Sequence, residues 1–117
     1  MKTVTYIKEF NHLSNKILHQ ILSLRANIFV VEQQCCYQDP DPIDLVATHV
    51  YQTSNNKNEV IAYLRICPPG SRFEDTSIGR VITKKTYRGQ GLCSTLLTKT
   101  MEHLLKDPSI TRISLSA

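Results

Sequence analysis

The residues best suited to chemistry lie at positions 87–94, with the sequence YRGQGLCS. Their two glycines separate a strand-like segment, 77–83, from an apolar segment of helical periodicity that ends at Asp107-Pro108. A glycine turn between a strand and a helix gathers backbone N–H groups at a helix N-terminus, where they can bind a phosphate. Glycine permits positive φ and close approach of a ligand, and Arg88 can form paired hydrogen bonds with phosphate oxygens. The stretch therefore predicts a phosphate-binding loop.

Three glycine-rich motifs compete for this loop. A P-loop requires Lys-Ser/Thr after its last glycine, where this chain has Leu92-Cys93. The dinucleotide motif Gly-x-Gly-x-x-Gly would have Ser94 as its last residue, and the next strand ends in SLSA without the acidic residue that holds a ribose. The third motif, Arg/Gln-x-x-Gly-x-Gly/Ala, fits from Arg88 onward except for Cys93. It resembles the acetyl-CoA loop of the GNAT acetyltransferase superfamily. A plain helix start without a ligand is the remaining alternative.

Composition limits the function classes. The chain has 117 residues, which predicts one domain over 1–117, and its 41% hydrophobic and 21% charged residues are typical of a globular protein. The net charge of +4 is scattered rather than gathered with aromatic residues, so we expect no nucleic-acid partner. No apolar run approaches the ~20 residues needed to span a bilayer, and the N-terminus lacks the apolar core of a signal peptide. We therefore expect no membrane partner and a cytoplasmic location. The four cysteines form no Cys-x-x-Cys pair, which predicts free thiols and no metal.

Periodicity along the chain predicts the elements that position the loop. Ser14 is a good N-cap for a helix that reaches about Val31, and a second helix runs from Leu92 to about Lys106, burying apolar residues that include Leu105. Strand patterns occupy 3–8, 46–52, 60–67, 77–83 and 110–115. Segments 46–52 and 60–67 are predicted to form an antiparallel hairpin. The order β-α-β-β-β-α-β predicts an α/β fold whose sheet is mixed, with its last two strands parallel.

A second group of motifs strengthens the resemblance to GNAT proteins. Residues 25–33 read RANIFVVEQ, residues 37–41 read YQDPD, and Asp44 and His49 follow. A first helix ending in Phe-Val-x-Glu-Gln, then an aspartate-rich loop and a His on the next strand, resembles the ElaA-like branch of the superfamily. The order of the predicted elements also matches the first part of a GNAT fold.

This resemblance implies an N-acetyltransferase that moves an acetyl group from acetyl-CoA to an amine of a small molecule or a protein. It implies that Val81 and Ile82 offer backbone groups to the pantetheine arm. It also implies that the pyrophosphate is held by Arg88, Gly89, Gln90, Gly91, Leu92 and Cys93. The amine must lose a proton, for which Glu32 and His49 are the candidate catalytic bases, and the carboxylates near the acceptor side would favour a cationic acceptor.

Each of these residues also has a purely structural interpretation. Glu32 can be a solvated carboxylate at a helix end, His49 a hydrogen-bonded strand residue, and Asp39 and Asp41 turn formers. Cys93 can be a packing residue or a thiol with a lowered pKa. GNAT domains usually continue beyond the fifth strand, so we expect a domain that is incomplete at its C-terminus. A homo-oligomer in which another copy completes the sheet is one alternative. The alternative function is a non-catalytic acyl-CoA-binding or assembly module.

Overall fold

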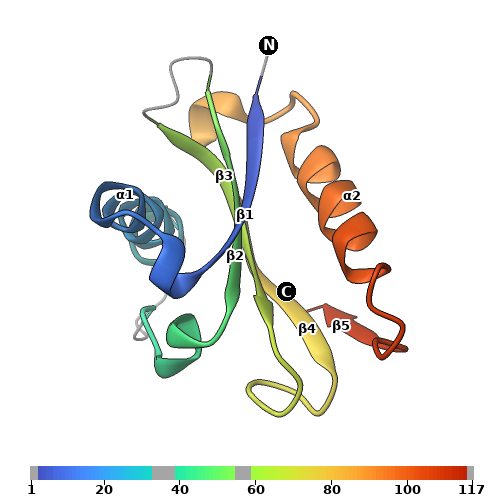
Figure 1. The fold of residues 1–117 in the computed structure, drawn as a ribbon. Coiled ribbons are helices and arrows are strands. Elements are labelled where there is room, and N and C mark those ends of the chain that lie inside the picture. Colours follow the sequence, from blue (N-terminus) through green and yellow to red (C-terminus); the bar gives the residue numbers. More distant parts are fainter. Residues whose placement is uncertain (1–2, 33–38, 55–58, 116–117) are drawn as a thin grey trace.

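A five-stranded sheet lies between two helices in the computed structural model, which describes residues 3–32, 39–54 and 59–115 (Figure 1). The sheet order is β1-β2-β3-β4-β5, antiparallel throughout except for the parallel pair β4 and β5. The predicted α/β class with a mixed sheet is confirmed. The strands are β1 Val4–Glu9, β2 Thr48–Thr53, β3 Val60–Cys67, β4 Thr76–Thr83 and β5 Ile113–Leu115.

Helix α1, Asn15–Ala26, covers one face of the sheet. The Ser14 hydroxyl accepts a hydrogen bond from the backbone N–H of Ile17 at 3.2 Å, so the predicted N-cap is confirmed. Ile21 and Leu24 pack the helix against tyrosine and isoleucine side chains of β2, β3 and β4. The chain then continues as a π-helical segment, η2, Asn27–Glu32. The helical path therefore extends as far as predicted, but its geometry changes at residue 27.

Helix α2, Leu92–Leu104, covers the opposite face, as Figure 1 shows. Leu92, Leu96 and Leu104 are buried against β2, β3 and β4. Leu105, predicted to be buried, is 71% exposed because it lies one residue beyond the end of the helix. No helix in the described ranges combines the length and apolarity that crossing a membrane requires.

Two strands begin later than predicted because turns occupy their first residues. The backbone N–H groups of Val46 and Ala47 both donate to Ile43 O, which continues the 3-10 segment η3, Pro42–Leu45, up to the start of β2. The N–H of Ile110 donates to Asp107 O at 3.1 Å in the turn that follows α2. Pairing of β5 with β4 starts only at Ile113.

The two parallel strands share only a short stretch of pairing. Thr76–Ile78 of β4 pairs with Ile113–Leu115, and the described part of β5 ends there, whereas β4 continues to Thr83. Residues 79–83 therefore have no strand partner on this side within the described residues. A β-strand edge without a partner presents its N–H and C=O groups to whatever binds beside it.

Candidate functional site

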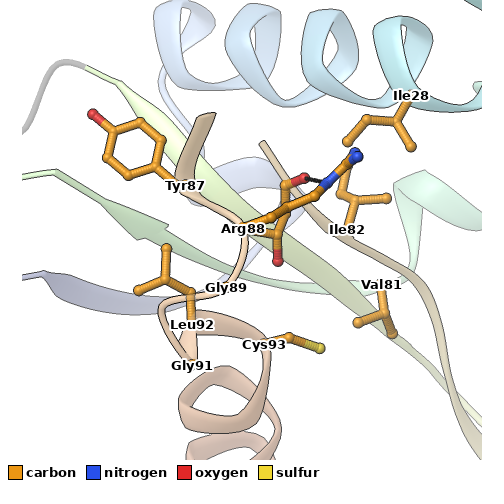
Figure 2. Close-up of a pocket in the computed structure, with 10 residues that line it drawn as sticks. Ile28, Val81, Ile82, Tyr87, Arg88, Gly89, Gly91, Leu92 and Cys93 are labelled. Carbon is orange, nitrogen blue, oxygen red and sulfur yellow. Dashed lines mark hydrogen bonds between the residues drawn. The ribbon is translucent and has the colours of Figure 1, made fainter. Parts of the chain in front are cut away.

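The open edge of β4 and the glycine loop border one pocket of about 380 Å³ (Figure 2). Every predicted cofactor residue except Gln90 lines it, and Gln90 lies exposed in the loop. Ile28 of η2, Thr83 and Tyr87 also line the pocket and were not predicted as site residues. Thr83 could have been found from the sequence, because it ends the strand that precedes the glycine loop. Ile28 lies on the opposite side of the pocket, and nothing in its local sequence indicates a site residue. The predicted lining residues are Val81, Ile82, Arg88, Gly89, Gly91, Leu92 and Cys93.

The loop has the backbone conformation for which its glycines are needed. Gly89 has φ +82° and Gly91 has φ +75°, both in the left-handed region that favours glycine. A Cβ atom at either position would meet nothing within 4 Å, so the requirement for glycine is conformational rather than steric. Gly91 is the N-cap of α2, whose first N–H groups have no acceptor within the helix. These groups and the helix dipole make this end of the pocket suitable for an anion.

A carboxylate from the start of β3 anchors the approach to this loop. Glu59 accepts hydrogen bonds from Lys84 Nζ at 2.5 Å and from Tyr87 Oη at 3.0 Å. The hydrogen bond from Lys84, reinforced by the one from Tyr87, holds the pKa of Glu59 below its usual value. Arg88 Nε donates to Thr83 O at 3.0 Å, the bond drawn in Figure 2. The loop is thus fixed to β4 and β3 at both ends of the 3-10 segment η4, Lys85–Tyr87.

Strand β4 carries a bulge beside the pocket. Its register against β3 shifts between the pairs Arg65↔Gly79 and Tyr63↔Ile82, so two residues of β4 face the single residue Leu64. The two residues are Arg80 and Val81. Arg80 has φ +53°, and it is the single non-glycine residue with positive φ in the described ranges. A bulge bends its strand and changes the direction of the residues that follow, which here line the pocket.

Two buried arginines, Arg25 of α1 and Arg65 of β3, share one aspartate. Arg25 and Arg65 are 0% and 1% exposed, and both donate to Asp44 Oδ1, at 2.8 and 2.9 Å. Burial alone would raise the pKa of Asp44, but the hydrogen bonds and charges of the two guanidinium groups outweigh it and hold that pKa below its usual value. An ion pair this deeply buried is tolerated because hydrogen bonds join its charged groups, although Arg65 Nε has no partner among the described residues.

Two more aspartates complete the same cluster. Asp39 accepts from Arg25 Nε and from Arg80 Nε, both at 2.9 Å. Asp41 accepts from Arg65 at 2.7 Å and contacts Arg80 at 3.5 Å. Three carboxylates therefore face three guanidinium groups, and their charges cancel. Arginines already pair with these aspartates, so this cluster does not support the expected attraction of a cationic acceptor.

His49 is buried beside this cluster and away from the pocket lining. Its Nε2 lies 2.9 Å from Asp44 O, a pure acceptor, so Nε2 carries the proton, and Nδ1 accepts from Tyr63 Oη at 2.6 Å. Burial, opposed by the Asp44 carbonyl, lowers the pKa of His49, which is 1% exposed. Both ring nitrogens are occupied, and this geometry favours the structural interpretation of His49 over the catalytic one.

Comparison with known proteins identifies the fold that builds this site. A family model described as "Acetyltransferase (GNAT) family" matches residues 18–117. The chain belongs to the GNAT acetyltransferase family. An acyl-CoA N-acyltransferase of Pseudomonas aeruginosa is 33% identical, with a TM-score of 0.89 over 99% of this chain and 80% of that one. The structure of Escherichia coli ElaA gives the same identity and TM-score, over 99% of this chain and 78% of that one.

The curated relatives of this GNAT domain confirm the ElaA-like resemblance. Escherichia coli ElaA is 38% identical over 92 residues, which are 79% of this chain and 60% of that protein. A UPF0039 protein of Synechocystis is 34% identical over 100 residues, or 86% of this chain and 64% of that protein. The chain thus spans less than two thirds of the length of these relatives.

The structure describes only some of the remaining predicted residues of the GNAT domain. The backbone of Glu32 ends η2, four residues beyond the pocket residue Ile28, but its side chain lies outside the described part. Cys93 is a half-buried free thiol at the pocket, and Cys67 is a buried one. Cys35 and Cys36 lie outside the described residues. Within the described ranges, no three His, Cys, Asp or Glu side chains come together as a metal site.

Proposed function

We propose that this chain is an N-acetyltransferase that uses acetyl-CoA as the donor and an amine of a small molecule or protein as the acceptor. One observation carries the proposal: a single pocket joins the open edge of β4 to the left-handed glycine loop at the start of α2. A thioester on a long amide-containing arm, attached to a pyrophosphate, has the chemistry that such a pocket would bind. The family membership and the acyltransferase fold support the same donor.

Each part of the donor has a matching part of the pocket. The backbone N–H groups of residues 89–93, Gln90 included, would hold the pyrophosphate at the N-terminus of α2, and Arg88 would add a positive charge. The amides of the pantetheine arm would pair with the β4 backbone at Val81 and Ile82, as an added strand does. The thioester would then lie between β4 and β5, where their pairing ends at Ile78.

The reaction is a direct transfer between two nucleophiles. The neutral amine nitrogen attacks the thioester carbonyl carbon, a C–N bond forms, and the C–S bond breaks to release the thiolate of coenzyme A. The attacking nitrogen gives up one proton to a base, and the thiolate gains one proton. Backbone N–H groups beside the bulge would stabilise the negative charge that develops on the carbonyl oxygen.

Glu32 is our proposed base, acting directly or through a water molecule. An amine is protonated near neutral pH, so a group of the protein must take its proton before attack. The backbone of η2 brings Ile28 to the pocket and ends at Glu32, which supports this assignment. His49 is less suited to this role, because both of its ring nitrogens are already bonded in the core.

Ligand binding and turnover test the two parts of the proposal separately. Acetyl-CoA should bind in calorimetry and raise the melting temperature, since a ligand at about 100 times its Kd stabilises the native state by about 2.7 kcal/mol. ADP should also bind, because it carries the pyrophosphate that contacts the loop. If neither ligand binds, the pocket is not a coenzyme site and the proposal fails.

Release of free coenzyme A with a panel of primary amines tests the transfer step. Turnover that depends on both the amine and the enzyme supports the acetyltransferase. Tight binding of acetyl-CoA without turnover of any amine would favour the alternative, a non-catalytic acyl-CoA-binding module. Intact mass of the assayed protein should be recorded beside the rates, since the chain spans only 60% of Escherichia coli ElaA.

A further inference from the structure

We propose that Arg80 is a positioning residue, and that its ion pair with Asp39 holds the β4 bulge in the shape that the donor pocket requires. The inference rests on the proposed function for its ligand, acetyl-CoA, but concerns residues outside the pocket lining. Arg80 itself is not among the residues that line the pocket, whereas the next three residues of β4 all are.

The backbone of Arg80 is in a conformation that it would not adopt unaided. At φ +53° its Cβ crowds the backbone, which is why left-handed residues in strands are nearly always glycine. Strain of this kind persists only where the surrounding structure holds it, and it concentrates at functional sites. Arginine at this position therefore needs a structural reason.

The side chain of Arg80 supplies that reason. Its Nε donates to Asp39 Oδ1 at 2.9 Å, and one terminal nitrogen donates to Asp39 O at 3.2 Å. The guanidinium group also lies over the ring of Phe29 in η2, 5.8 Å from the ring centre, and is 13% exposed. These contacts can form only when the side chain leaves β4 toward residues 39–41 and η2.

Asp39 is a rigid anchor because a second arginine holds it from the other side. The buried Arg25 of α1 donates to Asp39 Oδ2 and to Asp39 O, both at 2.9 Å. Asp39 is 4% exposed, so its carboxylate has no solvent to turn toward. The strained residue is thereby tied to α1, the element that also leads into η2 and its pocket residue Ile28.

The bulge determines where the pocket edge begins. Pairing with β5 ends at Ile78, two residues before Arg80, and the first lining residue, Val81, follows directly. If residue 80 relaxed to an extended conformation, β4 would lose the extra residue opposite Leu64 and residues 81–83 would shift in register. The Asp39–Arg80 pair thus acts on the donor through the backbone of β4.

Two substitutions at the same position separate the backbone from the side chain. Arg80→Ala and Arg80→Gly both remove the ion pair, but only glycine can keep positive φ without strain. We expect acetyl-CoA affinity to fall by about tenfold or more in Arg80→Ala and by about threefold or less in Arg80→Gly. Equal losses in the two variants, or parent-like affinity in Arg80→Ala, would overturn the proposal.

Asp39→Asn provides a second test that does not depend on the alanine variant folding. It should weaken acetyl-CoA binding in the parent background and have no further effect on affinity when added to Arg80→Gly, because the pair is already absent there. Additive losses would mean that Asp39 acts without Arg80. Val50→Ala, a core change in β2, a strand that does not pair with β4, is the control for lost stability.

Amide NMR shifts of residues 81 and 82 distinguish failure of this inference from failure of the proposed function. If the parent does not bind acetyl-CoA, the proposed function fails, but the shifts still report the bulge. They should stay close to the parent in Arg80→Gly and move in Arg80→Ala. The same displacement in both variants would show that glycine does not preserve the bulge, and the positioning role would be wrong.

Discussion

The imidazole of His49 is bonded between the Tyr63 phenol and the Asp44 carbonyl oxygen, so the fold requires its neutral form. A second proton could be added only on Nδ1, which already accepts the phenol hydrogen. The positive charge would also lie near Arg25 and Arg65, whose charges oppose it. A histidine at an exposed strand position could have the same sequence pattern, but its ring would be free to take up a proton.

The pKa of His49 leads to a prediction about stability near neutral pH. Burial lowers the folded-state pKa below about 6.5, so the unfolded chain binds more protons there and stability is lost as pH falls from about 6.5 toward the folded-state pKa. The free energy of unfolding should fall by up to about 1.4 kcal/mol per pH unit in that window. His49→Gln should flatten the dependence, as measured by urea unfolding at several pH values.

His103→Gln is the matched control for that series. His103 is exposed near the end of α2, so the control should keep the parent's pH dependence. A flat profile in the parent, or a His49→Gln profile as steep as the parent's, would contradict the prediction.

Glu32 is expected to affect turnover and hardly affect donor affinity. Glu32→Gln keeps the shape of the side chain and removes the base, so a general-base role predicts a loss of about 10²–10⁴-fold in kcat. Acetyl-CoA affinity should stay within a few-fold of the parent, because Glu32 is not among the residues of the glycine loop that would hold the phosphates. Undiminished turnover in the variant would contradict the prediction and indicate that water, not Glu32, takes the proton.

The pocket beside β4 depends on how three elements, β4, the glycine loop and α2, are joined. The loop leaves β4 through η4, turns at two left-handed glycines, and enters α2 at Gly91. Hydrogen bonds to Glu59 and to Thr83 O fix residues 84–88, which lead into the loop. The approach to the helix start is therefore held in place by the protein itself, which reduces the ordering that anion binding requires.

Gly91→Val should abolish measurable acetyl-CoA binding, whereas Arg88→Ala should weaken it only several-fold. Valine disfavours φ +75° by roughly 1–2 kcal/mol and adds a branched side chain beside the bound phosphate. Arg88 supplies one contact among several. Calorimetry with acetyl-CoA and with ADP checks both variants.

Gly70→Val is a closely matched control for Gly91→Val. Gly70 also has a left-handed φ, +83°, and a Cβ there would likewise meet nothing within 4 Å, but it lies in the turn between β3 and β4. It should lose comparable stability and keep its affinity for acetyl-CoA. If both valine variants bind the donor as well as the parent does, the loop is not the phosphate site.

For the molecule as a whole, the arginine–aspartate cluster connects residues 39–44, which belong to no strand, to one helix and two strands. It links α1 through Arg25, β3 through Arg65 and β4 through Arg80 to residues 39–44. Four of its six members, Arg25, Arg65, Asp39 and Asp44, are buried, where a cation or anion left alone would be costly. The cluster is therefore stable only as a complete set.

Asp44→Asn should destabilise the fold by about 3–5 kcal/mol, because it leaves two buried guanidinium groups short of one counter-charge. Urea unfolding measures the change. Asp107→Asn, in an exposed turn after α2, is the control and should change stability little. A small effect of Asp44→Asn would mean that water or a rearranged carboxylate compensates for the lost charge.

Some features follow from the sequence alone because local interactions determine them. Ser14 caps α1 through an oxygen three residues from its donor, and Gly89 and Gly91 adopt left-handed angles that other residues disfavour. The period of the apolar residues likewise specifies each helix and strand within a few residues. The element order and the phosphate-loop motif could therefore be predicted together with the family resemblance.

Other features depend on which distant residues meet, and only the tertiary structure decides them. Asp44 lies 19 positions from Arg25 and 21 from Arg65, so its motif alone suggested an acidic surface where the fold forms a neutral cluster. The register between β3 and β4 places the bulge at Arg80, and no local preference of arginine predicts it. Packing also bonds His49 to Tyr63, 14 positions away, and Glu59 to Tyr87, 28 positions away, and no local pattern in the sequence specifies either pair.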